Sequence, residues 1–140
     1  MYSPLIEKMI KRNDYPLVSQ DNLELFSEAS EYSVLFFTEN PKNFPESNDV
    51  AVILPELMQA FGNHIQVGVV DRNHERPLQA RYRFRGFPAL VFLKQGSYLD
   101  VITKVKNWSE YTEEVTRILS LETSEPPAFD LSVICPGAAA

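Results

Sequence analysis

The chain has 140 residues, of which 44% are apolar and 23% are charged, as in an average soluble globular domain. Its 13 Lys and Arg residues stand against 19 Asp and Glu residues, so the formal charge of −6 argues against nucleic-acid binding and favours a basic partner. The longest apolar run, residues 87–93, is far shorter than the ~20 residues of a membrane-spanning helix, and residues 1–7 lack a secretory-signal pattern. We therefore expect a cytoplasmic protein without membrane insertion.

Apolar spacing predicts the elements in the first quarter of the chain. Residues 5–13 are expected to form a short amphipathic helix, and residues 16–18 a short strand. A second helix is expected to follow, with Ser19 or Asp21 as its N-cap. Residues 32–38 are an almost continuous apolar run, which is typical of a central strand that is covered on both faces.

The middle of the chain predicts a loop, a helix, a strand and a second helix. Residues 40–49 combine turn formers with two prolines and are expected to form a loop, followed by a helix over residues 50–61. Pro55 lies inside that helical pattern, so the helix either kinks there or begins late. Residues 65–71 predict the next strand, and Pro77 suits the first turn of a short helix.

The last third predicts a β-hairpin and a closing helix. Residues 87–93 and 98–105 are expected to pair as antiparallel strands, and Ser109 is expected to cap the final helix. The order of elements requires a mixed sheet flanked by helices. We expect one domain over residues 1–121. Residues 122–140, which contain three acids and no basic residue, are expected to form a flexible acidic tail.

The cysteine and histidine content excludes several kinds of site. Cys135 is the only cysteine, so an intramolecular disulfide, a CxxC redox pair and a multi-cysteine zinc site are all excluded. His64 and His74 lack the spacing of metal ligands, and Asp71 alone does not complete a metal site, so both histidines are expected at the surface or in turns. Glycine-rich nucleotide motifs are absent as well. We expect no metal and no cofactor.

Residues 82–96 resemble the thioredoxin pattern, in which Arg-Gly-apolar-Pro opens a strand and a Lys-polar-Gly turn ends it. In this resemblance Pro88 matches the cis-proline, residues 53–57 match the kinked second helix, and Asp71 matches the aspartate that ends a strand. The resemblance covers roughly residues 16–120. It implies an α/β, thioredoxin-like, three-layer α/β/α fold with a mixed central sheet, to which the chain adds an N-terminal helix and a flexible C-terminal tail.

The chain departs from thioredoxins where their redox chemistry takes place. Residues 39–46, at the place of the CxxC motif, contain no cysteine, and the strand residues 34–37 lack the buried carboxylate that thioredoxins use. Both parts of the redox apparatus are missing. We therefore do not expect an enzyme.

The loop pattern Pro41-Lys42-x-x-Pro45-Glu46-x-x-Asp49, followed by a helix, resembles hydrogenase expression proteins of the HyaE, HupG and HoxO type. These are cysteine-less, thioredoxin-like accessory proteins of membrane-bound nickel–iron (NiFe) uptake hydrogenases. The resemblance implies a non-catalytic assembly chaperone. Its expected partner is the hydrogenase small-subunit precursor, bound before export through its twin-arginine signal peptide, with other hydrogenase accessory proteins as further candidates.

The expected partner site has an acidic wall, a basic wall and an apolar floor. Four acids of the loop and the following helix outweigh Lys42, which would attract a twin-arginine segment; the alternative is a solvated acidic surface. Five arginines between residues 72 and 85 would form the opposite wall; the alternative is an exposed helix face. Phe44 is the expected exposed anchor, whereas Trp108 is more typical of the core or of a helix start. The predicted partner-binding residues are Glu39, Lys42, Phe44, Glu46, Asp49, Glu56, Phe87 and Pro88.

A second functional class stays open at this point. A lone thiol can form a mixed disulfide, so the alternative to a chaperone is a thiol-disulfide oxidoreductase accessory that acts through Cys135 with a cysteine of its partner. No base lies beside Cys135 in the sequence, so nothing local would activate its thiol.

Overall fold

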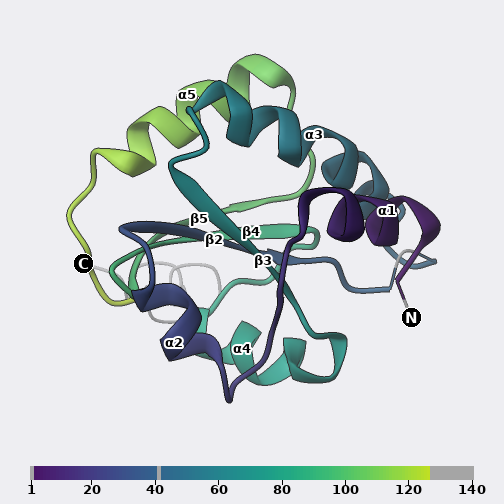
Figure 1. Cartoon of the computed structure of the whole chain (residues 1–140), viewed down its shortest axis with the longest axis horizontal. Coiled ribbons are helices and arrows are strands. Elements are labelled where there is room, and N and C mark those ends of the chain that lie inside the picture. Colours follow the sequence, from purple (N-terminus) through teal and green to yellow (C-terminus); the bar gives the residue numbers. More distant parts are fainter. Residues whose placement is uncertain (1, 41, 127–140) are drawn as a thin grey trace, which may run out of the picture.

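A five-stranded sheet lies between two layers of helices in the computed structural model, which describes residues 2–40 and 42–126 (Figure 1). The strand order is β1-β3-β2-β4-β5, in which β1, β3 and β2 run parallel while β4 and β5 are antiparallel to their neighbours. The strands are β1 (Leu17–Val18), β2 (Tyr32–Phe37), β3 (Ile65–Val70), β4 (Ala89–Lys94) and β5 (Ser97–Thr103). The predicted mixed sheet is confirmed.

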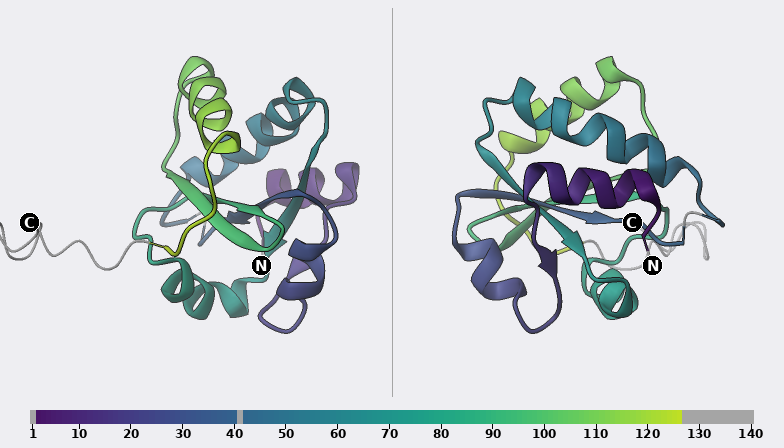
Figure 2. Two further views of the ribbon diagram at one scale, coloured as in Figure 1. Left: turned by 90° about the vertical axis from the view of Figure 1, so that its left-hand side faces the viewer. Right: turned by 45° about the vertical axis from the view of Figure 1, so that its right-hand side comes forward.

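Three helices cover one face of the sheet and two cover the other (Figures 1 and 2). The first layer contains α1 (Pro4–Asn13), α3 (Glu46–Ala60) and α5 (Trp108–Leu119). The second contains α2 (Leu23–Glu28) and α4 (Glu75–Tyr82), which a single 3₁₀ turn, η1 (Arg72–His74), precedes. This arrangement confirms the three-layer α/β/α fold with an additional N-terminal helix.

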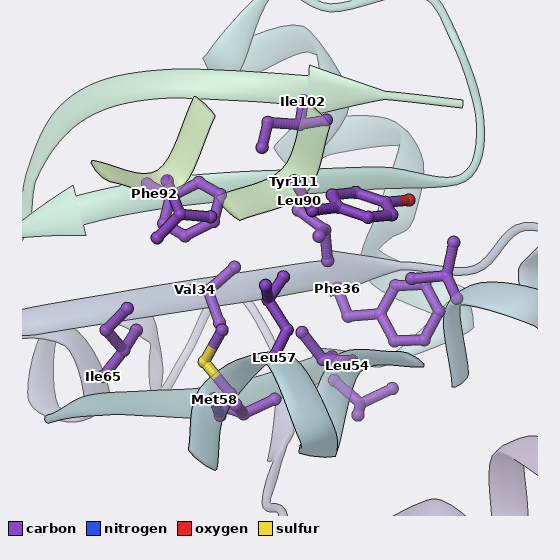
Figure 3. Close-up of a cluster of buried hydrophobic side chains, with 14 of the residues drawn as sticks. Val34, Phe36, Leu54, Leu57, Met58, Ile65, Leu90, Phe92, Ile102 and Tyr111 are labelled. Atoms are coloured by element: carbon purple, nitrogen blue, oxygen red, sulfur yellow. The ribbon is translucent and has the colours of Figure 1, made fainter. Parts of the chain in front are cut away.

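The buried side chains of β2 alternate between the two faces and support both layers. Val34 and Phe36 point toward α3, where they meet Leu54 and Leu57 (Figure 3). Leu35 and Phe37 point to the other face. They belong to a second buried cluster, which includes side chains of α4. Each such side chain contributes about 1.5–3 kcal/mol when it is fully buried. The near-continuous apolar run of this strand is therefore explained by two separate cores.

Gly68 is required where β3 passes under the second helical layer. A Cβ atom at this position would lie 2.4 Å from Cγ2 of Val18 and 2.8 Å from Cζ of Phe26. Because real Cβ atoms do not approach other atoms this closely, only glycine allows α2 to pack against this strand.

Both predicted helix caps are wrong. No side chain caps α2; instead Asn22 accepts from the Ser19 amide at 2.8 Å and donates to the Leu17 carbonyl at 3.1 Å, which ties the turn to the edge of β1. The N-cap of α5 is Asn107 and not Ser109. Asn107 and Glu110 form a reciprocal capping box, with bonds of 2.8 and 3.2 Å.

Helix α3 begins four residues earlier than predicted, at Glu46, and continues through Pro55 to Ala60. The turn-forming residues 46–49 belong to its first turn. The side chain of Ser47 is fully buried there and donates to the Thr38 carbonyl at the end of β2. This contact between the strand and the helix explains why the chain turns helical so soon after the loop.

The chain keeps making contacts with the domain beyond the last helix. The Ser124 amide donates to the Tyr98 carbonyl at 3.0 Å, and Arg83 donates to the Pro126 carbonyl at 3.1 Å. Residues 122–126 thus contact the sheet and the end of α4, while most of the predicted tail, residues 127–140, lies outside the described residues. None of the helices within the described residues is long and apolar enough to cross a membrane.

Candidate functional site

The candidate site lies where β2 ends beside the start of β4. The peptide bond between Phe87 and Pro88 is cis, as predicted, and both residues are buried just before the strand. The Pro88 carbonyl accepts from the Lys104 amide at 2.7 Å, which fixes this turn to the end of β5. The predicted floor of the site therefore lies beneath the surface rather than open to a partner.

An aromatic stack connects the loop after β2 to the core. The ring centroids of Phe44 and Phe87 are 5.5 Å apart, those of Phe87 and Phe84 are also 5.5 Å apart, and those of Phe84 and Phe37 are 4.7 Å apart. Such edge and tilted contacts are favourable aromatic geometries. Phe44 is consequently only partly exposed, which corrects the expectation of a free apolar anchor.

Glu39 does not stand as a free acid on one wall of the site. Its Oε2 atom lies 3.2 Å from the Arg76 guanidinium, and its Oε1 atom accepts from the Asn40 amide at 3.2 Å. Arg76 also lies 5.9 Å from the centre of the Phe87 ring. Because the acidic and basic residues pair with each other over Phe87, the predicted division into opposite walls is wrong at this point.

Glu75 is the functional-site residue that sequence reasoning missed. Its side chain is only 3% exposed, its Oε2 atom accepts from the Glu39 amide at 3.0 Å, and its Oε1 atom lies 3.9 Å from Arg72. Burial raises the pKa of Glu75 to about 7; the nearby Glu39 carboxylate adds to the shift, and Arg72 and Arg76 oppose it.

The sequence did contain a signal for this burial. Glu75, Leu78 and Tyr82 recur at helical spacing, and all three lie on the buried face of α4. An acid on such an apolar stripe indicates a buried carboxylate rather than an exposed charge.

A buried polar network holds the end of β2 in place. The Thr38 hydroxyl accepts from Arg72 at 3.4 Å, while its carbonyl accepts from Ser47. Arg72 also packs 4.9 Å from the ring of Tyr2, whose hydroxyl donates to the Val70 carbonyl at 2.8 Å. The first residue after β2 is thereby tied to α3, to η1 and to the segment that precedes α1.

The other arginines do not form a free basic wall either. Arg81 pairs with Glu24 of α2 at 2.9 Å, and Arg83 donates to the Pro126 carbonyl. These contacts favour the alternative of a helix surface satisfied by its own neighbours over that of a peptide-binding wall.

The exposed charges that remain at the site are Lys42, Glu46 and Asp49. Lys42 stands in the loop, where its amide donates to the Asn40 side chain at 3.0 Å. Glu46 and Asp49 occupy the first turn of α3, where acids are favoured by the helix dipole. Glu56 does not join them, because it lies ten residues beyond Glu46 and seven beyond Asp49, about 15 and 10 Å farther along the helix at the rise of an α-helix.

Four further sequence expectations concern single residues. Asp71 accepts from the Asn73 amide at 2.9 Å and so begins η1. His74 accepts weakly from the Gln20 amide, and the described residues contain no group of three or more His, Cys, Asp or Glu residues that could hold a metal ion. Cys135 lies outside the described residues. Trp108 is 46% exposed as the first residue of α5, which corrects the core placement and agrees with a helix start.

Comparison with known proteins places this geometry in a family. Residues 5–111 match the family described as Hydrogenase-1 expression protein HyaE. The chain belongs to the HyaE family. The predicted resemblance to HyaE, HupG and HoxO proteins is thus confirmed.

The HyaE-family chain is similar to several named relatives. It is 39% identical to the hydrogenase expression/formation protein HoxO of Cupriavidus necator, over 94% of this chain and 83% of that protein. It is 37% identical to HupG of Rhizobium leguminosarum bv. viciae, over 86% of this chain and 83% of that protein. A crystal structure described as HupG from Rhodopseudomonas palustris aligns with a TM-score of 0.54 and 33% identity, over 75% of this chain and 95% of that one.

Proposed function

We propose that this HyaE-family protein is a non-catalytic assembly chaperone in the maturation of a NiFe uptake hydrogenase. It binds the hydrogenase small-subunit precursor in the cytoplasm, through the twin-arginine signal peptide, before export. The names of its relatives as hydrogenase expression/formation proteins support a role in maturation. The observation that carries the proposal is a cysteine-less loop at the thioredoxin active-site position, held by the buried Glu75 and Ser47 contacts.

The charges around the loop favour a basic client segment. Glu46 and Asp49 are exposed and make no ion pair with any described residue. They can therefore attract the arginines of a signal peptide during approach. Glu39 contributes little to this attraction because Arg76 already neutralises it. Phe44, beside the buried Phe87, offers the apolar contact after docking.

The steering role of the two acids is tested by charge reversal. We expect Glu46→Lys with Asp49→Lys to slow association with a synthetic small-subunit signal peptide by about tenfold at low salt, because electrostatic steering of this kind changes rates by ~10–10³-fold. The effect should shrink as the screening length falls from ~30 to ~8 Å. Stopped-flow binding at two salt concentrations measures both.

A matched control uses two other exposed acids with the same spacing, Glu28 and Glu31. They lie at the opposite end of β2, about 20 Å away along a six-residue strand. Reversing both to lysine changes the net charge of the protein equally but should leave the association rate within about twofold. Salt-independent binding, or equal loss in both double variants, would contradict the site.

Phe44→Ala separates docking from approach. We expect faster dissociation and an unchanged association rate, because an apolar contact contributes after contact is made. Circular dichroism checks that the variant keeps its fold, since the Phe44 ring also packs on Phe87. A variant that slows association and leaves dissociation alone would assign Phe44 a different role.

The client itself is tested in cells. The protein should co-purify with the small-subunit precursor and lose most of that precursor when the signal peptide is deleted. Equal recovery of both forms would place recognition on the mature subunit, and recovery of neither would refute the proposed function.

A further inference from the structure

A groove of about 370 Å³ runs between α1 and α3 and takes no part in the client site described above. Figure 2 shows α1 lying beside α3 on the same side of the sheet. Its volume falls within the ~300–1,000 Å³ of typical binding pockets. The apolar lining comes from both helices: Leu5, Met9, Ala51, Val52 and Pro55.

Two of these side chains are exposed although they are large and apolar. Leu5 is 46% exposed and Val52 is 56% exposed. The neighbouring Ile6 and Met9 are buried in the core, so α1 already has its anchoring contacts without them. Leu5 and Val52 are thus left facing one groove from opposite helices.

Pro55 removes one backbone hydrogen bond from the α3 wall of the groove. Proline has no amide hydrogen, so the carbonyl of Ala51 lacks its usual donor four residues later in α3. Ala51 and Pro55 both line the groove.

The α1 wall of the groove is basic although the whole chain carries a charge of −6. Lys8 and Arg12 stand on it one helical turn apart, both exposed and without an ion pair to any described residue. Lys11 is exposed beside them. The opposite wall contributes one carboxylate, Glu56.

We infer that the α1–α3 groove binds an amphipathic helix of a partner protein. The helix inserts an apolar side chain between Leu5 and Val52 and presents two carboxylates, one turn apart, to Lys8 and Arg12. Because α1 has ten residues, the contact spans about 15 Å, or three helical turns. This partner has the opposite charge to the basic client at Glu46 and Asp49, so the two sites can be occupied by different proteins.

A pair of matched synthetic peptides tests the charge requirement. Both are about 18 residues long and have the same leucine stripe, one with glutamates and the other with lysines at the flanking positions, each labelled for fluorescence anisotropy. We expect the acidic peptide to bind at least tenfold more tightly than the basic one. Equal affinity, or preference for the basic peptide, would overturn the inference.

Charge variants of the protein locate the site. Lys8→Glu with Arg12→Glu should weaken binding of the acidic peptide about tenfold and should improve binding of the basic one. The matched control reverses Lys104 and Lys106, which lie before α5, and should change neither affinity by more than about twofold. A loss of affinity of the same size in both double variants would mean that binding depends only on the net charge of the protein, and would overturn the assignment to the groove.

Apolar variants test the groove without disturbing the core. Val52→Asp should abolish binding of the acidic peptide, whereas Leu25→Asp, at a site that is 81% exposed on α2, should leave it unchanged. Sedimentation of the peptide-free protein is measured in parallel. Self-association that disappears in Val52→Asp would assign the groove to a second copy of the chain and overturn the acidic partner. Client binding by these variants tests the function proposed above separately.

Discussion

Glu75 makes the stability of the protein depend on pH through a single buried carboxyl. Its pKa is raised from 4.5 to about 7, so the native state binds the proton more tightly than the unfolded chain. The free energy of unfolding should therefore fall as pH rises from about 5 to 7, by up to ~1.4 kcal/mol per pH unit, and level off above that.

Glu75→Gln should remove this slope, because glutamine is neutral throughout yet still accepts from the Glu39 amide. In urea denaturation at pH 5, 6, 7 and 8, the free energy of unfolding of the variant should rise relative to that of the wild type as pH increases. Glu56→Gln, at an exposed position on α3, is the matched control and should follow the wild-type curve. Parallel curves for wild type and Glu75→Gln would show that Glu75 is not the group responsible.

The single thiol leads to a second prediction at this scale. Reduction of insulin disulfides needs one thiolate that attacks and a second thiol that resolves the mixed disulfide. The chain has only Cys135. We expect no turnover in an insulin-reduction assay from wild type or from Cys135→Ser. Turnover by wild type that Cys135→Ser abolishes would revive the oxidoreductase alternative.

At the scale of the elements, two substitutions at the start of α5 distinguish the observed N-cap, Asn107, from the predicted one, Ser109. Asn107→Ala should lower the free energy of unfolding by about 1 kcal/mol, because it leaves the Glu110 amide without its partner. Ser109→Ala is the matched control and should lie within ~0.5 kcal/mol of wild type. The two values come from chemical denaturation, and the reverse order would restore Ser109 as the cap.

The helices and strands could largely be predicted from the sequence, but the residues at which the helices begin could not. Local patterns identify the strand over residues 32–38 and the helical apolar face after residue 50. The start of α3 depends instead on the bond from Ser47 to Thr38, a contact across a loop that local composition does not report. Residues that favour turns also favour the first turn of a helix, so local composition alone predicts a loop over residues 46–49.

At the scale of the whole molecule, the candidate site was predicted in its place but not in its arrangement. The cis bond before Pro88 and the loop opposite it were expected from the thioredoxin resemblance. The pairing of Glu39 with Arg76 joins residues 37 positions apart in the sequence, so no spacing rule could reveal that they neutralise each other. Sequence charge counts therefore overestimate how many acids a client can meet.

The boundary of the domain is tested by two truncations. A chain ending at Pro126 keeps the Ser124–Tyr98 and Arg83–Pro126 hydrogen bonds, whereas a chain ending at Leu121 loses both. We expect the shorter chain to be less stable than the longer one by about 1–3 kcal/mol, because each of the two lost hydrogen bonds contributes about 0.5–1.5 kcal/mol. Equal thermal melting of the two truncated proteins would place the boundary at residue 121.

The exposed position of the only tryptophan determines which structural changes tryptophan fluorescence can report in this protein. Trp108 is already in contact with water in the native state, so its emission maximum should move little when the chain unfolds. Denaturation followed by tryptophan fluorescence would then show a shallow transition, while far-ultraviolet circular dichroism of the same samples shows a steep one. The same indole should be quenched readily by acrylamide, which makes it a reporter of events at the start of α5 and not of the core.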